Sequence, residues 1–170
     1  VYRLHSLLPE ALKIRTLANQ DQVEEVPFPD TRQAGSRKLT SRVAMSDLFY
    51  SFGNQAPGAL ELNNYPKFMQ ELSIPFFAVY DMGAVDIIRA RERGVPRYNE
   101  FRRQLGLNPI TSFDDLTDDK EVVRKTTKVY GNKPEDVEKL DLLVGTLSEK
   151  FRTTKFGFGE TMFQIFILNA

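Results

Sequence analysis

The sequence predicts a mainly α-helical fold, and two observations carry this prediction. Apolar residues recur at the spacing of a helix in several segments, as in Val122, Val123 and Thr126. Residues that cap or end helices bracket many of these segments, with Asp81 before one of them and Gly94 after it. Alternation of polar and apolar residues, the pattern of a strand, is brief, so little sheet is expected.

The part of the chain through residue 38 is expected to form a helix, a short strand and a loop. Residues 1–8 are predicted to be helical up to Pro9, because the residue before a proline avoids the α region. Residues 11–17 alternate apolar and basic side chains, which predicts a strand. Residues 18–38 lack apolar periodicity and are rich in turn residues, so they are expected to form one long surface loop.

The middle of the chain is expected to contain short helices. Thr40 or Ser41 can cap a helix through Phe52, and the segment 53–58 then breaks it. Further short helical stretches are expected over residues 59–64 and 67–72. Residues 74–80 are apolar, which fits either a buried strand or the entry to the next helix.

Capping signals divide the remainder into helices. Asp81 caps the first of them, the pair Asp118 and Glu121 resembles a capping box, and Pro134 suits a first helical position. The expected helices span residues 82–93, 99–105, 118–131, 134–140, 142–151 and 160–170.

Composition excludes several classes of function. The chain has 170 residues, enough for one domain with a sizeable core, and its formal net charge is zero. Zero net charge gives no reason to expect nucleic acid as a partner. The absence of cysteine excludes thiol catalysis and cysteine-ligated metal sites. No signal peptide or transmembrane segment is recognised, so localisation stays open, as does peripheral contact with a membrane.

The candidate chemistry lies in the first residues, at Tyr2 and His5. His5 is the only histidine, so it is the only side chain that could offer nitrogen or sulfur to a transition metal in the usual way. One such ligand cannot build a structural zinc site, but it can hold a haem iron, whose porphyrin supplies four donors. On a helix Tyr2 would share a face with His5. The alternative is a partly packed histidine without a ligand.

The segment Tyr2-Arg3-Leu4-His5-Ser6-Leu7-Leu8-Pro9 resembles the proximal helix of the animal-type haem peroxidase and cyclooxygenase superfamily, and most closely the fatty acid α-dioxygenases. Further blocks share the resemblance: residues 85–103 with Arg-Glu-Arg-Gly-Val-Pro-Arg-Tyr-Asn, residues 114–121 and 137–145, and Gly157-Phe158-Gly159-Glu160-Thr161-Met162. The resemblance implies the C-terminal portion of a single haem peroxidase-like catalytic domain over residues 1–170, as a fragment of a longer protein.

The same resemblance implies a chemistry. His5 matches the proximal ligand of the iron of haem b, and Tyr2 matches a tyrosine that becomes a radical. That radical takes a hydrogen atom from the carbon next to the carboxylate of a fatty acid, and addition of O2 gives a 2-hydroperoxy fatty acid. The distal histidine, calcium and the carboxylate-binding arginine of the family have no match here, so the remainder of the parent chain is expected to be a partner.

Three alternatives remain beside this hypothesis. One is a related lipid dioxygenase or cyclooxygenase that attacks its substrate in mid-chain. Another is an inactive helical fragment that does not bind haem. The third, a calcium-binding or interaction domain, rests on the acidic cluster of residues 114–119, whose spacing does not match an EF-hand loop.

Overall fold

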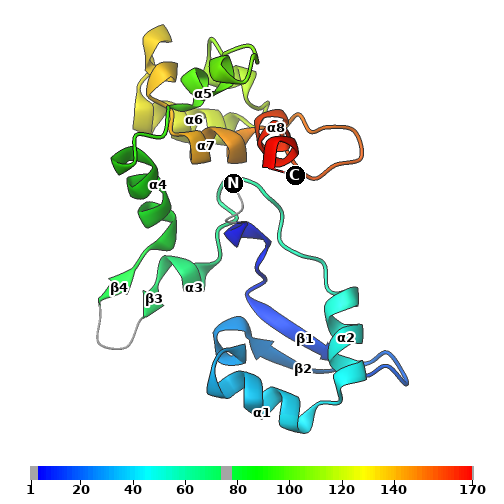
Figure 1. Ribbon diagram of the computed structural model, residues 1–170. Helices are drawn as coiled ribbons and strands as arrows, with labels where there is room; N and C mark the ends of the chain where they lie inside the picture. The colour runs from blue at the N-terminus through cyan, green and yellow to red at the C-terminus, as the bar shows by residue number, and fades with distance from the viewer. Residues whose placement is uncertain (1–3, 74–77, 170) are drawn as a thin grey trace.

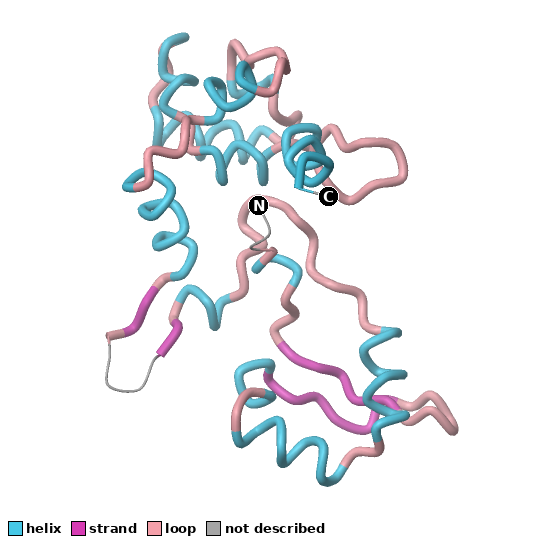
Figure 2. Tube along the Cα trace, viewed as in Figure 1, coloured by secondary structure: helices cyan, strands magenta, loops and turns pink. Residues whose placement is uncertain are grey.

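The structure is a computed structural model that describes residues 4–73 and 78–169. Most regular structure in these residues is helical, with two small antiparallel sheets of two strands each (Figures 1 and 2). The strands are β1 (Ala11–Arg15), β2 (Gln22–Pro27), β3 (Leu72–Ser73) and β4 (Val79–Tyr80). The α-helices are α1 (Ala34–Arg42), α2 (Met45–Asn54), α3 (Lys67–Gln70), α4 (Met82–Glu92), α5 (Tyr98–Gln104), α6 (Lys120–Tyr130), α7 (Leu142–Ser148) and α8 (Glu160–Asn169). Short 3₁₀ turns are η1 (His5–Leu7), η2 (Phe28–Thr31), η3 (Phe113–Asp115) and η4 (Pro134–Lys139). The mainly helical prediction is confirmed.

The first part of the chain forms a hairpin lobe of β1 and β2 covered by α1 and α2, which lies apart from α5 to α8 (Figure 1). Its small core consists of Leu12, Ile14, Val26, Leu39 and Leu48. The predicted strand at 11–17 is confirmed as β1. The prediction of one loop over 18–38 is wrong, because this segment contains β2, η2 and the start of α1. β2 buries only Val26, so its sequence shows no alternation to detect.

Two helix predictions in the middle of the chain also fail. The helix expected over 40–52 is split, because Val43 adopts an extended backbone, with φ of −112° and ψ of 129°, between α1 and α2. Residues 59–64, expected to be helical, form turns and irregular structure. The helix expected over 67–72 is present as the shorter α3, which ends at Gln70, and Leu72 instead begins β3. Residues 74–77 lie outside the described residues, and the end of the apolar stretch pairs as β4 with β3.

The second half of the chain follows the predicted helices closely. The Asp81 carboxylate caps α4 by accepting hydrogen bonds from the backbone N–H groups of Gly83 and Ala84. α6 is capped by Asp119, and not by the predicted box at Asp118. α7 ends at Ser148, earlier than expected. A second core, separate from that of the hairpin lobe, joins these helices through Tyr98, Ile110, Phe113, Leu116, Val137 and Leu140.

In the part of the chain that the structure describes, no helix is both long enough and apolar enough to cross a bilayer. The longest α-helices there, α4 and α6, have 11 residues each, about half of what a span requires.

Gly145 allows α7 to lie directly against the buried ring of Tyr98. A Cβ at this position would lie 2.1 Å from a ring carbon of Tyr98, far inside van der Waals contact. We expect Gly145→Ala to destabilise the fold by about 1–3 kcal/mol, since neither α5 nor α7 can move without disturbing the core. Urea unfolding followed by circular dichroism measures this change.

Gly53 is the matched control, because it also lies in a helix but a Cβ there would meet no atom within 4 Å. Gly53→Ala should leave stability unchanged or raise it by up to about 1 kcal/mol. Equal effects of the two substitutions would contradict the close approach at Gly145.

Candidate functional site

His5 lies in the 3₁₀ turn η1, which is held at both ends by backbone hydrogen bonds. The N–H of Leu8 donates to the carbonyl of His5 at 3.1 Å, and the N–H of Gly58 donates to the carbonyl of Leu7 at 3.1 Å. The helix predicted over 1–8 is therefore, in its described residues, a single tight turn that ends before Pro9. Tyr2, the predicted partner of His5, lies outside the described residues.

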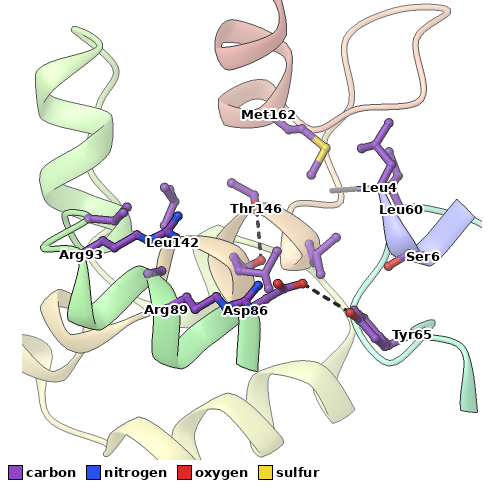
Figure 3. A pocket seen from close by; sticks show the side chains of 14 residues that line it. Leu4, Ser6, Leu60, Tyr65, Asp86, Arg89, Arg93, Leu142, Thr146 and Met162 are labelled. Atoms are coloured by element: carbon purple, nitrogen blue, oxygen red, sulfur yellow. Dashed lines mark hydrogen bonds between the residues drawn. The ribbon is translucent and has the colours of Figure 1, made fainter. Parts of the chain in front are cut away.

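The imidazole of His5 contacts two polar side chains through the same nitrogen. Nδ1 lies 2.7 Å from the hydroxyl of Tyr65 and 3.2 Å from Oδ2 of Asp86. The Tyr65 hydroxyl is itself 3.3 Å from that carboxylate oxygen, a contact visible in Figure 3. Tyr65 precedes α3 and Asp86 belongs to α4, so the imidazole joins three separate parts of the chain.

The other ring nitrogen, Nε2, accepts or donates no hydrogen bond within residues 4–73 and 78–169. Histidines that bind metals commonly engage one ring nitrogen with a carboxylate or carbonyl and offer the other to the metal. The His5 side chain is 22% exposed, and that of Asp86 is 9% exposed. This arrangement suits a single-histidine metal ligand.

An apolar cavity of about 330 Å³ lies beside this cluster. Figure 3 shows that its wall combines side chains from the start of the chain with others from α4, α7 and α8. The apolar wall includes Leu4, Leu60, Leu142, Leu143, Leu147 and Met162. α4 and its C-cap residue contribute Asp86, Arg89, Ala90 and Arg93, which follow the spacing of one helix face. A cavity of this size and character suits an apolar ligand with few polar contacts.

Asp141 fixes α4 and α7 relative to each other on one side of the cavity. It precedes α7 and accepts hydrogen bonds from Arg91 of α4, at 2.9 and 2.6 Å, and from the Tyr130 hydroxyl at 2.8 Å. Arg97 also pairs with it. Burial alone would raise the pKa of Asp141, but these hydrogen bonds and positive charges outweigh burial and hold the pKa below its usual value. Burial and Asp141 together raise the pKa of Tyr130 to about 12.

A second buried polar cluster holds the start of α8, and with it Met162 of the cavity wall. The carboxylate of Glu149 accepts from the backbone N–H of Thr161 at 3.0 Å and from its hydroxyl. Arg102 donates to the Thr161 hydroxyl at 2.8 Å and to Glu160 at 2.7 Å. Burial raises the pKa of Glu149 despite these hydrogen bonds. All the buried polar side-chain atoms of the described residues have partners.

The acidic side chains in residues 114–119 form ion pairs and hydrogen bonds with other groups of the protein. Asp114 pairs with Lys120, and Asp118 pairs with Lys150. Asp115 accepts from the backbone of Thr111 and Ser112, while Asp119 caps α6. Among the residues that the structure describes, no three His, Cys, Asp or Glu side chains gather as a metal cluster.

The animal haem peroxidase family model matches residues 1–170 of this sequence. The chain belongs to the animal haem peroxidase family. It is 42% identical over 184 aligned positions to a rice protein named alpha-dioxygenase PIOX, covering 100% of this chain and 29% of the rice protein.

Comparison with solved structures supports the same family. The crystal structure of fatty acid alpha-dioxygenase from Arabidopsis thaliana is 38% identical, with a TM-score of 0.87, and the match covers 99% of this chain and 28% of that one. A tyrosine-to-phenylalanine variant of the Oryza sativa fatty acid alpha-dioxygenase with palmitic acid is 42% identical, with a TM-score of 0.86 over 99% of this chain and 29% of that one. The chain therefore spans less than a third of the length of these relatives.

Haem is the cofactor that this family implies, and His5 fits it. The imidazole anchors one nitrogen through hydrogen bonds and leaves the other as the atom that would hold a haem iron. Sequence reasoning found His5 because it is the only histidine, but it assigned no role to Tyr65 or Asp86. A signal for Asp86 existed: it is the one acidic residue in the 86, 89, 90 and 93 stripe, on the helix face that turns toward the cavity.

Asp141 gives a test of the contacts that orient α4 and α7. Its folded pKa is depressed, so its stabilising contribution is complete above 3.8, the unfolded value, and is lost as the pH falls through the folded pKa. We expect Asp141→Asn to lower stability by about 1–3 kcal/mol at pH 7 and the difference from wild type to shrink below pH 4. Thermal unfolding between pH 7 and pH 3 measures both.

Asp114→Asn serves as the control for that experiment. Its side chain is 56% exposed and pairs with Lys120, which is 80% exposed, so solvent screens the interaction. This variant should differ from wild type by less than about 1 kcal/mol at neutral pH. A pH-independent loss in Asp141→Asn would show that its charge is not what stabilises the contact.

Proposed function

We propose that this chain forms part of a haem-dependent fatty acid α-dioxygenase, which converts a fatty acid and O2 to a 2-hydroperoxy fatty acid. The observation that carries the proposal is His5, whose Nδ1 contacts Tyr65 and Asp86, two residues that line an apolar cavity. Relatives that align along the whole chain are named alpha-dioxygenases, and one of them is described with palmitic acid. These names favour attack next to the carboxylate over the mid-chain alternative.

In this proposal His5 holds the iron of haem b through Nε2. Bound haem supplies the one-electron oxidising chemistry that protein side chains lack. The contribution of this chain is to fix the orientation of the imidazole, through two contacts on Nδ1, and to keep its surroundings apolar. The low polarity of the cavity excludes water from reactive species.

Tyr2 is proposed as the residue that acts on the substrate. As a tyrosyl radical, its phenoxyl oxygen takes a hydrogen atom from the carbon next to the carboxylate, so that an O–H bond forms as the C–H bond breaks. O2 adds to the resulting carbon radical to give a peroxyl radical. The peroxyl radical takes a hydrogen atom back from Tyr2, which releases the 2-hydroperoxy acid and restores the tyrosyl radical.

The cavity is proposed to take part of the acyl chain. Its leucines and Met162 offer dispersion contacts without hydrogen-bonding groups, as a saturated chain requires. We further propose that residues 1–170 are the C-terminal portion of one catalytic domain, and that other parts of the protein supply the distal base, the calcium site and the arginine for the substrate carboxylate. The similarity to relatives more than three times as long supports this assignment.

Haem ligation is tested by titrating the chain with haemin and following the Soret band. We expect saturable binding by the wild type and a loss of at least about 10-fold in affinity in His5→Ala, because the axial ligand is removed. Imidazole added to the variant should restore part of the spectrum. An unchanged spectrum in His5→Ala would place the ligand elsewhere, and absence of binding in both would support the inactive alternative.

The role of Tyr2 is tested by substitution with phenylalanine, which keeps the ring and removes the phenolic hydrogen. In the haem-loaded full-length protein that contains this chain, Tyr2→Phe should lower O2 uptake with palmitic acid by about 100-fold or more, with haem affinity unchanged. Tyr80→Phe, a matched change at an exposed tyrosine of β4, should retain the wild-type rate. Full activity in Tyr2→Phe would refute the proposed radical site.

A further inference from the structure

The cluster of His5, Tyr65 and Asp86 fixes the orientation of the imidazole and also restricts which of its atoms can carry a proton. Three heavy atoms are mutually within hydrogen-bonding distance: His5 Nδ1, the Tyr65 hydroxyl oxygen and Asp86 Oδ2, with separations of 2.7, 3.2 and 3.3 Å. A neutral imidazole carries one proton, on Nδ1 or on Nε2, and the hydroxyl carries one. The ionised carboxylate carries none and can only accept.

Only one proton arrangement makes all three contacts favourable. If Nδ1 is protonated, it donates to the Tyr65 oxygen and faces the carboxylate with its N–H, while the Tyr65 hydroxyl donates to Asp86. If Nε2 is protonated instead, Nδ1 presents a lone pair to Asp86 Oδ2 at 3.2 Å, so two acceptors face each other without a proton between them. The Tyr65 hydroxyl has a single proton, so it could then donate to only one of these two acceptors.

The surroundings strengthen this preference. The side chain of Asp86 is nearly buried and that of His5 is mostly buried, so water screens the contact only in part. Tyr65 presents its ring nearly perpendicular to the imidazole, at 81° with 5.7 Å between centroids. The Gln70 side chain donates to the backbone carbonyl of Tyr65 at 2.8 Å, which helps to hold the backbone of Tyr65 in place.

We propose that Tyr65 and Asp86 together select the Nδ1–H tautomer of His5, so that Nε2 keeps its lone pair before any ligand binds. Tyr65 is a positioning residue that makes the short contact to the imidazole, and Asp86 sets the direction of the Tyr65 proton. The inference rests on the proposed function in one respect: the exposed lone pair serves as the haem ligand. The proposed function names His5 as the ligand but gives Tyr65 no role. The inference adds that Tyr65 helps to select the tautomer of His5.

The tautomer can be read directly, because His5 is the only histidine and gives one pair of ring-nitrogen signals. The chain without haem, labelled with ¹⁵N-histidine, is measured by NMR at pH 7. We expect Nδ1 to have the chemical shift of a protonated nitrogen and Nε2 that of an unprotonated one. The opposite pattern would overturn the inference, whatever the haem titration shows.

Two variants separate the contributions of the pair. In Asp86→Ala the Tyr65 hydroxyl no longer donates to this carboxylate and is expected to donate to Nδ1, so the tautomer should change to Nε2–H. Addition of Tyr65→Phe to that variant removes the donor, and the two tautomers should become mixed. Asp86→Glu, which restores a carboxylate, should return the wild-type pattern. An Asp86→Ala variant that keeps the Nδ1–H tautomer would contradict the proposal.

A haemin titration of the same variants links the tautomer to ligation. Asp86→Ala should bind haem about 10- to 100-fold more weakly than the wild type, and Asp86→Glu should recover most of that loss. Unaltered far-UV circular dichroism shows that the variants remain folded. If His5→Ala still shows the wild-type haem spectrum, the proposed function fails while the tautomer result stands. If His5→Ala loses the spectrum but wild-type His5 is an Nε2–H tautomer, only the further inference fails.

Discussion

The buried carboxylate of Asp141 is the interaction on which the helical half of the molecule depends. It accepts hydrogen bonds from α4 and α6 and lies at the start of α7, so it fixes three helices at one point. The direction of α4 follows from this constraint, and the face that carries Asp86 turns toward η1. The geometry around His5 is thus determined partly by a residue 136 positions later in the chain.

Buried polar contacts also hold the start of α8. Glu149 lies just past the end of α7, yet its carboxylate accepts a hydrogen bond from the backbone N–H of Thr161 in the first turn of α8. Arg102 compensates the buried charge from α5. Both ends of α7 are therefore polar anchors, and the apolar side chains between them are free to line the cavity. A helix of only seven residues has little stability of its own, so these anchors are required.

The sequence predicted those parts of the fold whose signals are local. The cap at Asp81, the glycine after α6 and the proline of η4 each act within one turn, and the corresponding elements formed as expected. The strand β2 was missed because it buries a single side chain, and the split at Val43 has no breaking residue. The contacts of His5 with Tyr65 and Asp86 join residues 60 and 81 positions apart, which no spacing rule can reveal.

The two hydrophobic cores have no residue in common. η1 lies between them, on the route of the chain into the hairpin lobe, and the returning segment binds it again through Gly58. Parts of a protein that pack around separate cores often open as separate units. His5 therefore lies on the segment that connects two separately packed parts of the molecule, and a ligand bound there would link them.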